Sequence, residues 1–239
     1  MGALDRPLVV DLPLRGEWTV LQTPAHRIPS HGTDLFGQRY AYDLTRTDDR
    51  RGGGHVHPAS TLRWLLVGGR TRRCYAWGQP VHAALGGEVV VAVDDVPERR
   101  WIHVVREAWQ ALRNARAYAT GRTPLDVRRL AGNHVIIRTT DDGRDAYAVY
   151  AHLAPGSVTV DTGQHVAVGD VVGRVGHTGN STAPHLHFHV MDRADPTDAR
   201  GIPCAFAHYL VRHDGAWTGV HAGIPGRHER IRSPGPPDT

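Results

Sequence analysis

Short runs of alternating apolar and polar residues, separated by glycine and proline, recur along most of this chain. Side chains on a β-strand alternate between two faces, so such runs indicate strands with one buried face. They predict strands at residues 18–23, 38–44, 62–67, 88–93, 134–139, 146–152, 171–175 and 185–191. Strands this short, with turn residues between them, restrict the chain to a mainly β fold of antiparallel hairpins.

Residues 157–176 (SVTVDTGQHVAVGDVVGRVG) show this pattern in its tightest form, with valines alternating with polar residues and glycines at the turns. Biotinyl and lipoyl carrier domains are built from hairpins of the same kind, and they attach their cofactor to a lysine. All 28 basic residues of this chain are arginine. A carrier function is therefore excluded, whereas a duplicated-hairpin, barrel-sandwich hybrid-like fold remains the prediction.

Three segments depart from the strand pattern. Residues 45–60 are polar and glycine-rich, which predicts a loop. Residues 223–239 are rich in Gly, Pro and Arg, which predicts a disordered tail after a single domain of residues 1–222. Residues 101–118 have helical periodicity, which predicts a helix packed on the sheet within an insertion of about residues 97–130. The side chains on its apolar face are Trp101, Val104, Val105, Ala108, Trp109 and Leu112.

Composition argues against several classes of protein. The formal charge of +4 comes from scattered arginines without a basic run, which argues against nucleic acid as a partner. No apolar stretch reaches the roughly 18 residues that span a bilayer, and the N-terminus lacks the pattern of a signal peptide. The chain as given therefore indicates either a cytoplasmic protein or the mature or misannotated start of an exported one, and the sequence does not separate the two. Nothing in it indicates an oligomeric state. Cys74 and Cys204 lie in apolar surroundings and are expected to be buried.

The segment HLHFHV, residues 185–190, is the strongest sign of chemistry. On a strand, His185, His187 and His189 share one face, whereas the apolar residues between them face the core. Side chains two residues apart on a strand lie roughly 7 Å apart, so one imidazole can bind a metal ion while its neighbour reaches a water beside that ion. The alternative is a polar face exposed to solvent, which three histidines in register make less favoured.

Several motifs occur in a specific order along the chain: GNHVIIR (132–138), YAVYAHL (147–153), the glycine-spaced hairpins and GHTGNSTAPHLHFHV (176–190). Together they resemble the successive motifs of the lysostaphin-type zinc endopeptidases. The resemblance is dense over about residues 132–191 and weaker over about residues 31–93.

The resemblance implies a set of site residues. In that family an N-terminal His and Asp, and the second His of the His-x-His strand, bind zinc, and two further histidines flank the metal-bound water. Here the implied zinc ligands are His31, Asp43 and His187, and the implied catalytic residues are His152 and His185. The family usually has Glu or Gln at the position of His189, which leaves this residue as a supporting group or an imidazole without a role.

The aspartate ligand has two candidates. The family's usual pattern places Asp four residues after His, whereas SHGTDLFGQRYAYDL offers Asp34 or Asp43 after His31. Divergent members resemble this stretch, with a longer gap closed by a Gln-x-Tyr-Ala-x-Asp strand. Asp43 lies in a strand-like run beside the small Ala41, whereas Asp34 lies in a glycine-flanked segment where aspartate commonly forms turns. We therefore favour Asp43.

Such a ligand set predicts a catalytic centre. Zinc held by two histidines and a carboxylate keeps one position open for water, lowers the pKa of that water to about 7 and polarises a carbonyl. Of His152 and His185, one would take the proton from the water and the other would stabilise the oxyanion and protonate the leaving amine. The resemblance implies that the bonds cleaved are peptide bonds in the cross-links or stem peptides of peptidoglycan.

Other polar residues need separate interpretations. His55 and His57 form a second His-x-His, but they follow three glycines and precede a proline, which predicts a mobile loop. His82 occupies a strand position and is expected to be structural. Asn133 lies where the family often has a polar residue near the cleft, so a substrate contact is expected there.

Two rival functions share this fold class. A catalytically silent zinc-binding or cell-wall-binding module would have lost one of the five key residues, whereas this chain has all five. The sugar phosphotransferase IIA proteins share the paired-hairpin architecture and use two histidines on neighbouring strands. That chemistry requires neither Asp43 nor a third histidine at the same centre.

Overall fold

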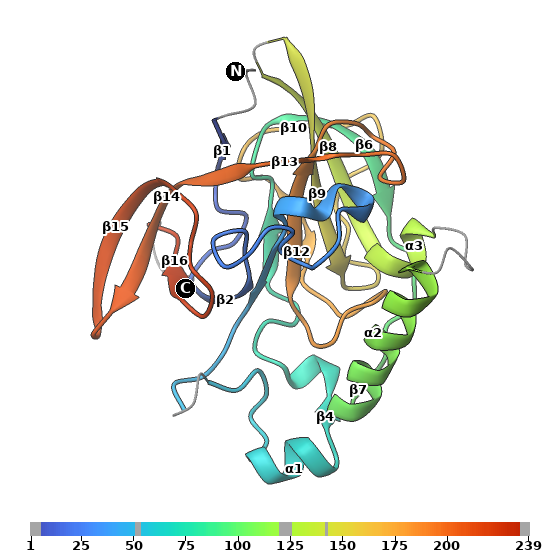
Figure 1. The fold of residues 1–239 in the computed structure, drawn as a ribbon, viewed down its shortest axis with the longest axis vertical. Helices are drawn as coiled ribbons and strands as arrows, with labels where there is room; N and C mark the ends of the chain where they lie inside the picture. The colour runs from blue at the N-terminus through green and yellow to red at the C-terminus, as the bar shows by residue number, and fades with distance from the viewer. Residues whose placement is uncertain (1–5, 51–53, 120–125, 142, 235–239) are drawn as a thin grey trace.

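Figure 1 shows the computed structural model, which describes residues 6–50, 54–119, 126–141 and 143–234. One large sheet dominates these residues, and its strand pairs are antiparallel except for β1 with β14. Its neighbouring strands are, in order, β1 (Leu8–Val10), β14 (Cys204–His213), β16 (Arg230–Arg232), β2 (Glu17–Gln22), β3 (Tyr42–Thr45), β12 (Leu186–Met191), β9 (Arg144–Leu153), β8 (Asn133–Asp141), β6 (Gly87–Val93) and β10 (His165–Val166). The mainly β, antiparallel fold predicted from the sequence is confirmed.

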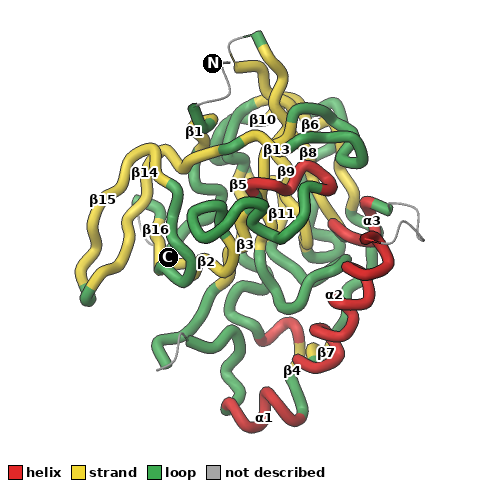
Figure 2. The backbone as a smooth tube through the Cα atoms, in the orientation of Figure 1, coloured by secondary structure: helices red, strands yellow, loops and turns green. Residues whose placement is uncertain are grey.

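Smaller elements complete the described fold. β13 (Gly201–Ile202) pairs with β12, and β15 (Ala216–Gly223) pairs with β14. Two short ribbons stand apart from the sheet, β5 (Pro80–His82) with β11 (Val171–Arg174) and β4 (Gly69–Arg70) with β7 (Trp101–Ile102). The α-helices lie toward one end and side of the molecule (Figure 2) and are α1 (Thr61–Leu66), α2 (Val104–Ala119) and α3 (Val127–Ala131). The 3-10 segments are η1 (Leu35–Tyr40), which lies near the middle of the view, and η2 (Thr71–Arg73).

Strand β12 divides the core from the candidate site. Leu186, Phe188 and Val190 are fully buried in the main apolar cluster, where the Phe188 ring packs on Tyr150 of β9. The alternation of a β-strand then directs the intervening histidines to the opposite face. This part of the sequence prediction is confirmed.

Two predicted strands differ in the structure. Residues 62–67 fall largely within helix α1, because the Ser60 side chain caps the helix by accepting a hydrogen bond from the Arg63 amide. Leucine, tryptophan and arginine are also tolerated or favoured in helices. Residues 38–40 belong to η1, and only Tyr42–Thr45 form strand β3.

The predicted helix of the insertion is present as α2, but its predicted packing is wrong. Val105, Trp109 and Leu112 are 67%, 59% and 51% exposed, whereas Glu107 is 2% exposed on the opposite face. Helical periodicity identified an amphipathic helix correctly. The buried face, however, is chosen by an ion-pair network around Glu107 and not by the apolar stripe.

The predicted disorder of residues 223–239 is wrong for the part that the structure describes. Strand β16 lies between β2 and β14, and its Ile231 side chain is fully buried. The flanking Arg230 bonds Glu17 and Asp49, which explains how a polar segment is held in the sheet. Residues 235–239 lie outside the described part of the chain.

The remaining fold expectations concern loops, cysteines and membrane spans. Within the predicted loop of residues 45–60, Thr45 is the last residue of β3, whereas residues 46–50 and 54–60 contain neither helix nor strand. Cys74 and Cys204 are buried and free, as expected. Among the described helices, none combines the length and the apolar character required to cross a bilayer.

Candidate metal centre

A pocket of about 330 Å³ opens on the face of the sheet opposite the core. Strands β3, β8, β9 and β12 form its floor, and η1 and α3 contribute to its rim. Six of the lining residues are histidines: His31, His134, His152, His185, His187 and His189. Asp43 is the acidic residue among them.

His31, Asp43 and His187 converge in this pocket. Strand β12 pairs with β3 so that His187 lies opposite Asp43, which brings the imidazole Nδ1 to 2.9 Å from Asp43 Oδ1. The loop residue His31 places its Nε2 2.9 Å from Asp43 Oδ2. One donor atom from each of the three residues lies within 4.8 Å of the others, which is the geometry of a metal site. The alternative carboxylate, Asp34, is exposed and pairs with Arg39 instead.

A backbone carbonyl sets the orientation of the His187 ring through His189. His189 Nε2 lies 3.1 Å from the Phe36 carbonyl oxygen, so Nε2–H donates and Nδ1 is left as an acceptor. His187 Nε2 lies 3.1 Å from that Nδ1 and therefore donates its proton to it. The lone pair of His187 Nδ1 then points at the Asp43 carboxylate.

The ring of His31 is held in a similar way. Its Nδ1 lies 3.0 Å from the hydroxyl of Ser30, which itself reaches the Gln38 carbonyl oxygen at 3.5 Å. If the hydroxyl donates to the carbonyl, it accepts from His31 Nδ1–H, and the lone pair of His31 Nε2 faces Asp43. Two imidazole lone pairs directed at one carboxylate repel one another unless a cation lies between them. The donor set of two nitrogens and an oxygen therefore fits a zinc ion.

His152 and His185 lie next to this cluster with one nitrogen each directed at it. His152 Nδ1 bonds the Thr178 carbonyl at 3.0 Å, and His185 Nδ1 bonds the Ala183 carbonyl at 2.7 Å. Each Nε2 is thereby left without a proton when the ring is neutral, and that of His185 lies 3.4 Å from Asp43 Oδ1. The two ring centroids are 4.8 Å apart.

Backbone strain accompanies the position of His152. Its φ of 64° lies in the left-handed region, which residues other than glycine seldom adopt. The Gly176 amide bonds the His152 carbonyl at 2.9 Å and so stabilises this conformation. Strain of this kind is concentrated at functional sites, because the surrounding structure must maintain it.

Asp43 and the histidines of the pocket shift one another's pKa values. Burial opposes the charge of Asp43, but His31 and His185 hold the pKa of its carboxyl well below the usual value. Burial lowers the pKa of His152 well below its usual value, with His185 and His187 adding to the effect. Burial also acts on His185, but Asp43 outweighs it and raises the pKa. Burial lowers the pKa of His187, and an ionised carboxylate beside a neutral ligand imidazole is the state that binds a divalent cation.

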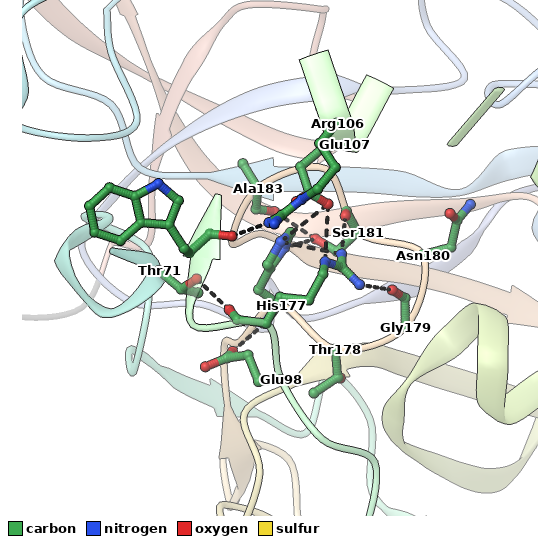
Figure 3. A network of polar contacts seen from close by, with 12 residues as sticks. Thr71, Glu98, Arg106, Glu107, His177, Thr178, Gly179, Asn180, Ser181 and Ala183 are labelled. Atoms are coloured by element: carbon green, nitrogen blue, oxygen red, sulfur yellow. Dashed lines mark hydrogen bonds and ion pairs between the residues drawn. The ribbon is translucent and has the colours of Figure 1, made fainter. Parts of the chain in front are cut away.

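A second network connects the loop of residues 177–183 to Glu107 of α2 (Figure 3), and Ser181 joins this network to His185. Ser181 Oγ lies 3.2 Å from His185 Nδ1 and 2.9 Å from His177 Nδ1. Arg99 bonds the Ser181 carbonyl at 2.8 Å and pairs with Glu107 of α2 at 3.0 Å. Both residues lie in the motif of residues 176–190, but the sequence did not reveal that His177 and Ser181 support the site.

Of the other sequence expectations, those for Asn133 and His57 do not match the structure, whereas that for His82 does. Asn133 is fully buried and bonds both backbone polar groups of Val96, so it does not contact substrate. His134 lines the pocket instead, and alternation along β8 was the available signal. His57 is buried against the Trp64 ring and does not belong to a mobile loop. His82 makes a structural bond to the Gly169 carbonyl.

The sequence profile of peptidase family M23 matches residues 74–199, just over half of the chain. The chain belongs to peptidase family M23. His152, His185 and His187 lie inside the matched segment, whereas His31 and Asp43 precede it. The family assignment confirms the resemblance to lysostaphin-type enzymes seen in the sequence.

Curated relatives of this M23 chain match it over short segments. A peptidoglycan DD-endopeptidase, ShyA, from Vibrio cholerae is 38% identical over 77 residues, which are 31% of this chain and 17% of that protein. An uncharacterised metalloprotease from Haemophilus influenzae is 42% identical over 66 residues, 27% of this chain and 13% of that protein. The chain thus spans less than a fifth of the length of either relative.

Solved structures are similar at low sequence identity. The catalytic domain of lysostaphin from Staphylococcus simulans is 22% identical, with 61% of this chain and 81% of that chain covered and a TM-score of 0.33. A zinc-containing peptidase from Vibrio cholerae is also 22% identical, with 54% of this chain and 27% of that chain covered and a TM-score of 0.31.

Proposed function

We propose that this M23 chain is a zinc-dependent endopeptidase that hydrolyses peptide bonds in the cross-links or stem peptides of peptidoglycan. The observation that carries this proposal is the convergence of His31 and His187 on Asp43, with one ring nitrogen of each at 2.9 Å from a carboxylate oxygen. The substrate class is taken from the curated relative, whose name describes a peptidoglycan endopeptidase.

In this proposal His31, Asp43 and His187 hold the zinc ion. Zinc supplies Lewis acidity when bound, because it lowers the pKa of a coordinated water and polarises a carbonyl. His189 and Ser30 keep the two ligand rings in the tautomer that presents a lone pair. Partners that fix ring orientation in this way contribute strongly to the affinity of a metal site.

In this proposal, His152 and His185 transfer the proton of the attacking water. Each presents Nε2 to the pocket while its Nδ1–H is held by a backbone carbonyl, so each neutral ring is ready to accept a proton from an attacking water. The ring that has gained the proton can return it to the leaving amine. Residues of η1 and α3 line the pocket beside the histidine cluster, and the substrate peptide would enter there.

The test compares the metal content and the activity of matched variants. Wild type is expected to bind about one zinc per chain and to release peptide fragments from purified cell-wall sacculi. Asp43→Asn is expected to lose both properties, whereas the control Asp34→Asn keeps both because Asp34 lies outside the cluster. His152→Ala and His185→Ala are expected to retain zinc and to lose roughly 10²–10⁴-fold in hydrolysis.

Each result discriminates between functions. Stoichiometric zinc in wild type without release of fragments would replace the proposal by a silent binding module. An Asp43→Asn variant that still binds zinc tightly would exclude the proposed ligand set. Transfer of label from a phosphohistidine donor to the zinc-free chain would favour phosphotransfer.

A further inference from the structure

Helices α1 and α2 leave a set of large apolar side chains uncovered. Single exposed apolar residues are common on proteins, but a contiguous group of them marks a binding surface. The exposed members are Leu62, Leu65, Leu66, Val67, Trp101, Val105, Trp109 and Leu112, here called the helical face.

Hydrogen bonds join the two halves of the helical face. Trp101 Nε1 donates to the Val67 carbonyl at 2.8 Å, and His103 Nε2 lies 3.2 Å from the Leu66 carbonyl. The β4–β7 ribbon ties the end of α1 to the start of α2. Figure 1 shows both helices at the same end of the molecule, where they form its lower part.

The exposed charges within the two segments that carry the helical face are of one sign. Residues 61–73 and 99–114 contain a single acid, Glu107, which is buried in its ion pairs. The exposed arginines of these two segments are Arg63, Arg70, Arg72, Arg73, Arg100, Arg106 and Arg113. A partner that covers this surface must therefore be apolar and anionic at once.

A basic pocket lies directly beside the apolar side chains. It has a volume of about 210 Å³, and Trp101 of the helical face is one of its lining residues. Its polar side chains come from Arg63, Arg70, Arg73 and His57, with no acid among the lining residues. Arginine clusters of this kind bind phosphate through several hydrogen bonds.

We propose that the helical face docks this protein on the surface of a lipid bilayer that contains anionic phospholipids. The apolar side chains of α1 and α2 enter the boundary between head groups and acyl chains, as in interfacial amphipathic helices rich in arginine and tryptophan. Trp101 and Trp109 suit this depth because an indole has an apolar ring and a polar N–H. The basic pocket takes a lipid phosphate.

The charge pattern also argues against a second copy of the chain as the occupant. Two helical faces brought together would oppose seven arginines with seven arginines, and no exposed acid of these segments would compensate them. A bilayer supplies the required anions and the apolar layer together. Placement at a membrane is a property beyond the proposed peptidase activity and does not depend on it.

The experiment is co-sedimentation of the full chain with vesicles of phosphatidylcholine, with and without phosphatidylglycerol. Binding is expected only with phosphatidylglycerol, and it is expected to weaken as salt is raised. Val105→Glu is expected to weaken binding on the order of tenfold, since it places a carboxylate at the contact. The double change Arg63→Ser and Arg70→Ser is expected to weaken binding by a similar factor, because each arginine near an anionic surface contributes to affinity.

Matched controls separate docking from misfolding. Val168→Glu changes a valine that is 50% exposed, against 67% for Val105, and lies away from the helical face. Arg144→Ser changes an exposed arginine of the β8–β9 hairpin. Both controls should bind like wild type, and every variant should unfold at the same temperature. Equal binding to both kinds of vesicle, or equal binding by Val105→Glu and Val168→Glu, would overturn the proposal. A dimer in sedimentation that Val105→Glu converts to monomer, without lipid binding, would assign the surface to self-association instead.

Discussion

At the scale of single residues, the site depends on backbone carbonyls that determine which nitrogen of each histidine carries a proton. Phe36, Thr178 and Ala183 each accept a hydrogen bond from one imidazole, and the opposite nitrogen of each ring is left as an acceptor. An ordinary histidine on a strand would rotate or change tautomer freely. Here the choice is made before any ion or substrate arrives, which reduces the cost of binding.

His189 supplies the clearest test of this orientation. His189→Phe removes the acceptor for His187 Nε2–H, so zinc affinity is expected to fall roughly 10–100-fold. The measurement is a competition titration against a chromogenic chelator. His134→Phe is the control, because His134 lines the same pocket but bonds the Gly132 carbonyl and not the cluster. Equal zinc affinity in wild type and His189→Phe would show that His189 has no supporting role.

Stability of the metal-free protein is expected to depend on pH in a definite direction. Burial lowers the pKa of six described histidines, that of His177 to about 2, whereas the pKa of His185 is raised. The six are His57, His134, His152, His177, His187 and His189. A lowered folded pKa means that the unfolded chain binds the proton more readily, so stability is complete above about pH 6.5 and falls as the pH is lowered.

The measurement is urea unfolding in chelator between about pH 7.5 and pH 5, where each such histidine contributes up to about 1.4 kcal/mol per pH unit. His185 acts in the opposite direction, because its raised pKa favours the folded state as the pH falls. The net expectation is still a loss, since the lowered groups outnumber it. His177→Asn should reduce the slope. A free energy of unfolding that is constant across this range would contradict the expectation.

At the scale of elements, α2 is joined to the site through charge and not through apolar packing. Glu107 pairs with Arg99 and Arg106, and Arg99 holds the carbonyls of Gly179 and Ser181 in the loop beside His185 (Figure 3). Gly179 has a φ of +65°, and a Cβ there would lie 2.4 Å from the Leu130 carbonyl, so the loop also fits tightly against α3. The insertion is therefore part of the support of the site.

Glu107→Gln tests this connection. Loss of the charge leaves two arginines without their buried partner, which is expected to cost about 3–5 kcal/mol of stability. It is also expected to lower kcat more than it raises KM, because the loop that orients His185 is loosened. The control Glu88→Gln breaks an ion pair with Arg138 at the surface, and its expected cost in stability is about 0–1 kcal/mol. Unchanged kcat in a folded Glu107→Gln variant would limit α2 to other roles.

At the scale of the whole molecule, the C-terminal segment completes the sheet. Strand β16 pairs with both β2 and β14 and so joins the last part of the chain to the first. The Thr23 hydroxyl donates to the Pro225 carbonyl at 2.7 Å across the same junction. Because β3 follows β2 in the sheet, this closure also supports the strand that carries Asp43.

Ile231→Ala measures the contribution of this closure. Ile231 is fully buried, so its truncation is expected to cost about 2–5 kcal/mol in the free energy of unfolding. Ile224→Ala changes an exposed isoleucine of the same segment and is expected to cost little. Thermal and urea unfolding report the difference. Equal stabilities of the two variants would show that residues 223–234 contribute nothing to folding.

The sequence by itself determined those features that depend on local periodicity and on ordered motifs. Alternation in HLHFHV was sufficient to place three histidines opposite the core, and the motif order was sufficient for the family. The strand-like context of Asp43 was sufficient to prefer it to Asp34, and in the structure Asp43 is the aspartate that lies beside His31 and His187. All of these follow from the geometry of one strand or one turn.

Only the tertiary structure decided which side chains of each helix and strand are buried against the rest of the protein. The apolar stripe of α2 predicted packing against the sheet, yet Glu107 faces inward because Arg99, Arg106 and the loop at His177 offer it charges and hydrogen bonds. Ile231 is buried although its neighbours are polar, because a gap between β2 and β14 accepts one short strand. Burial depends on partners that are distant along the chain, and no local pattern contains that information.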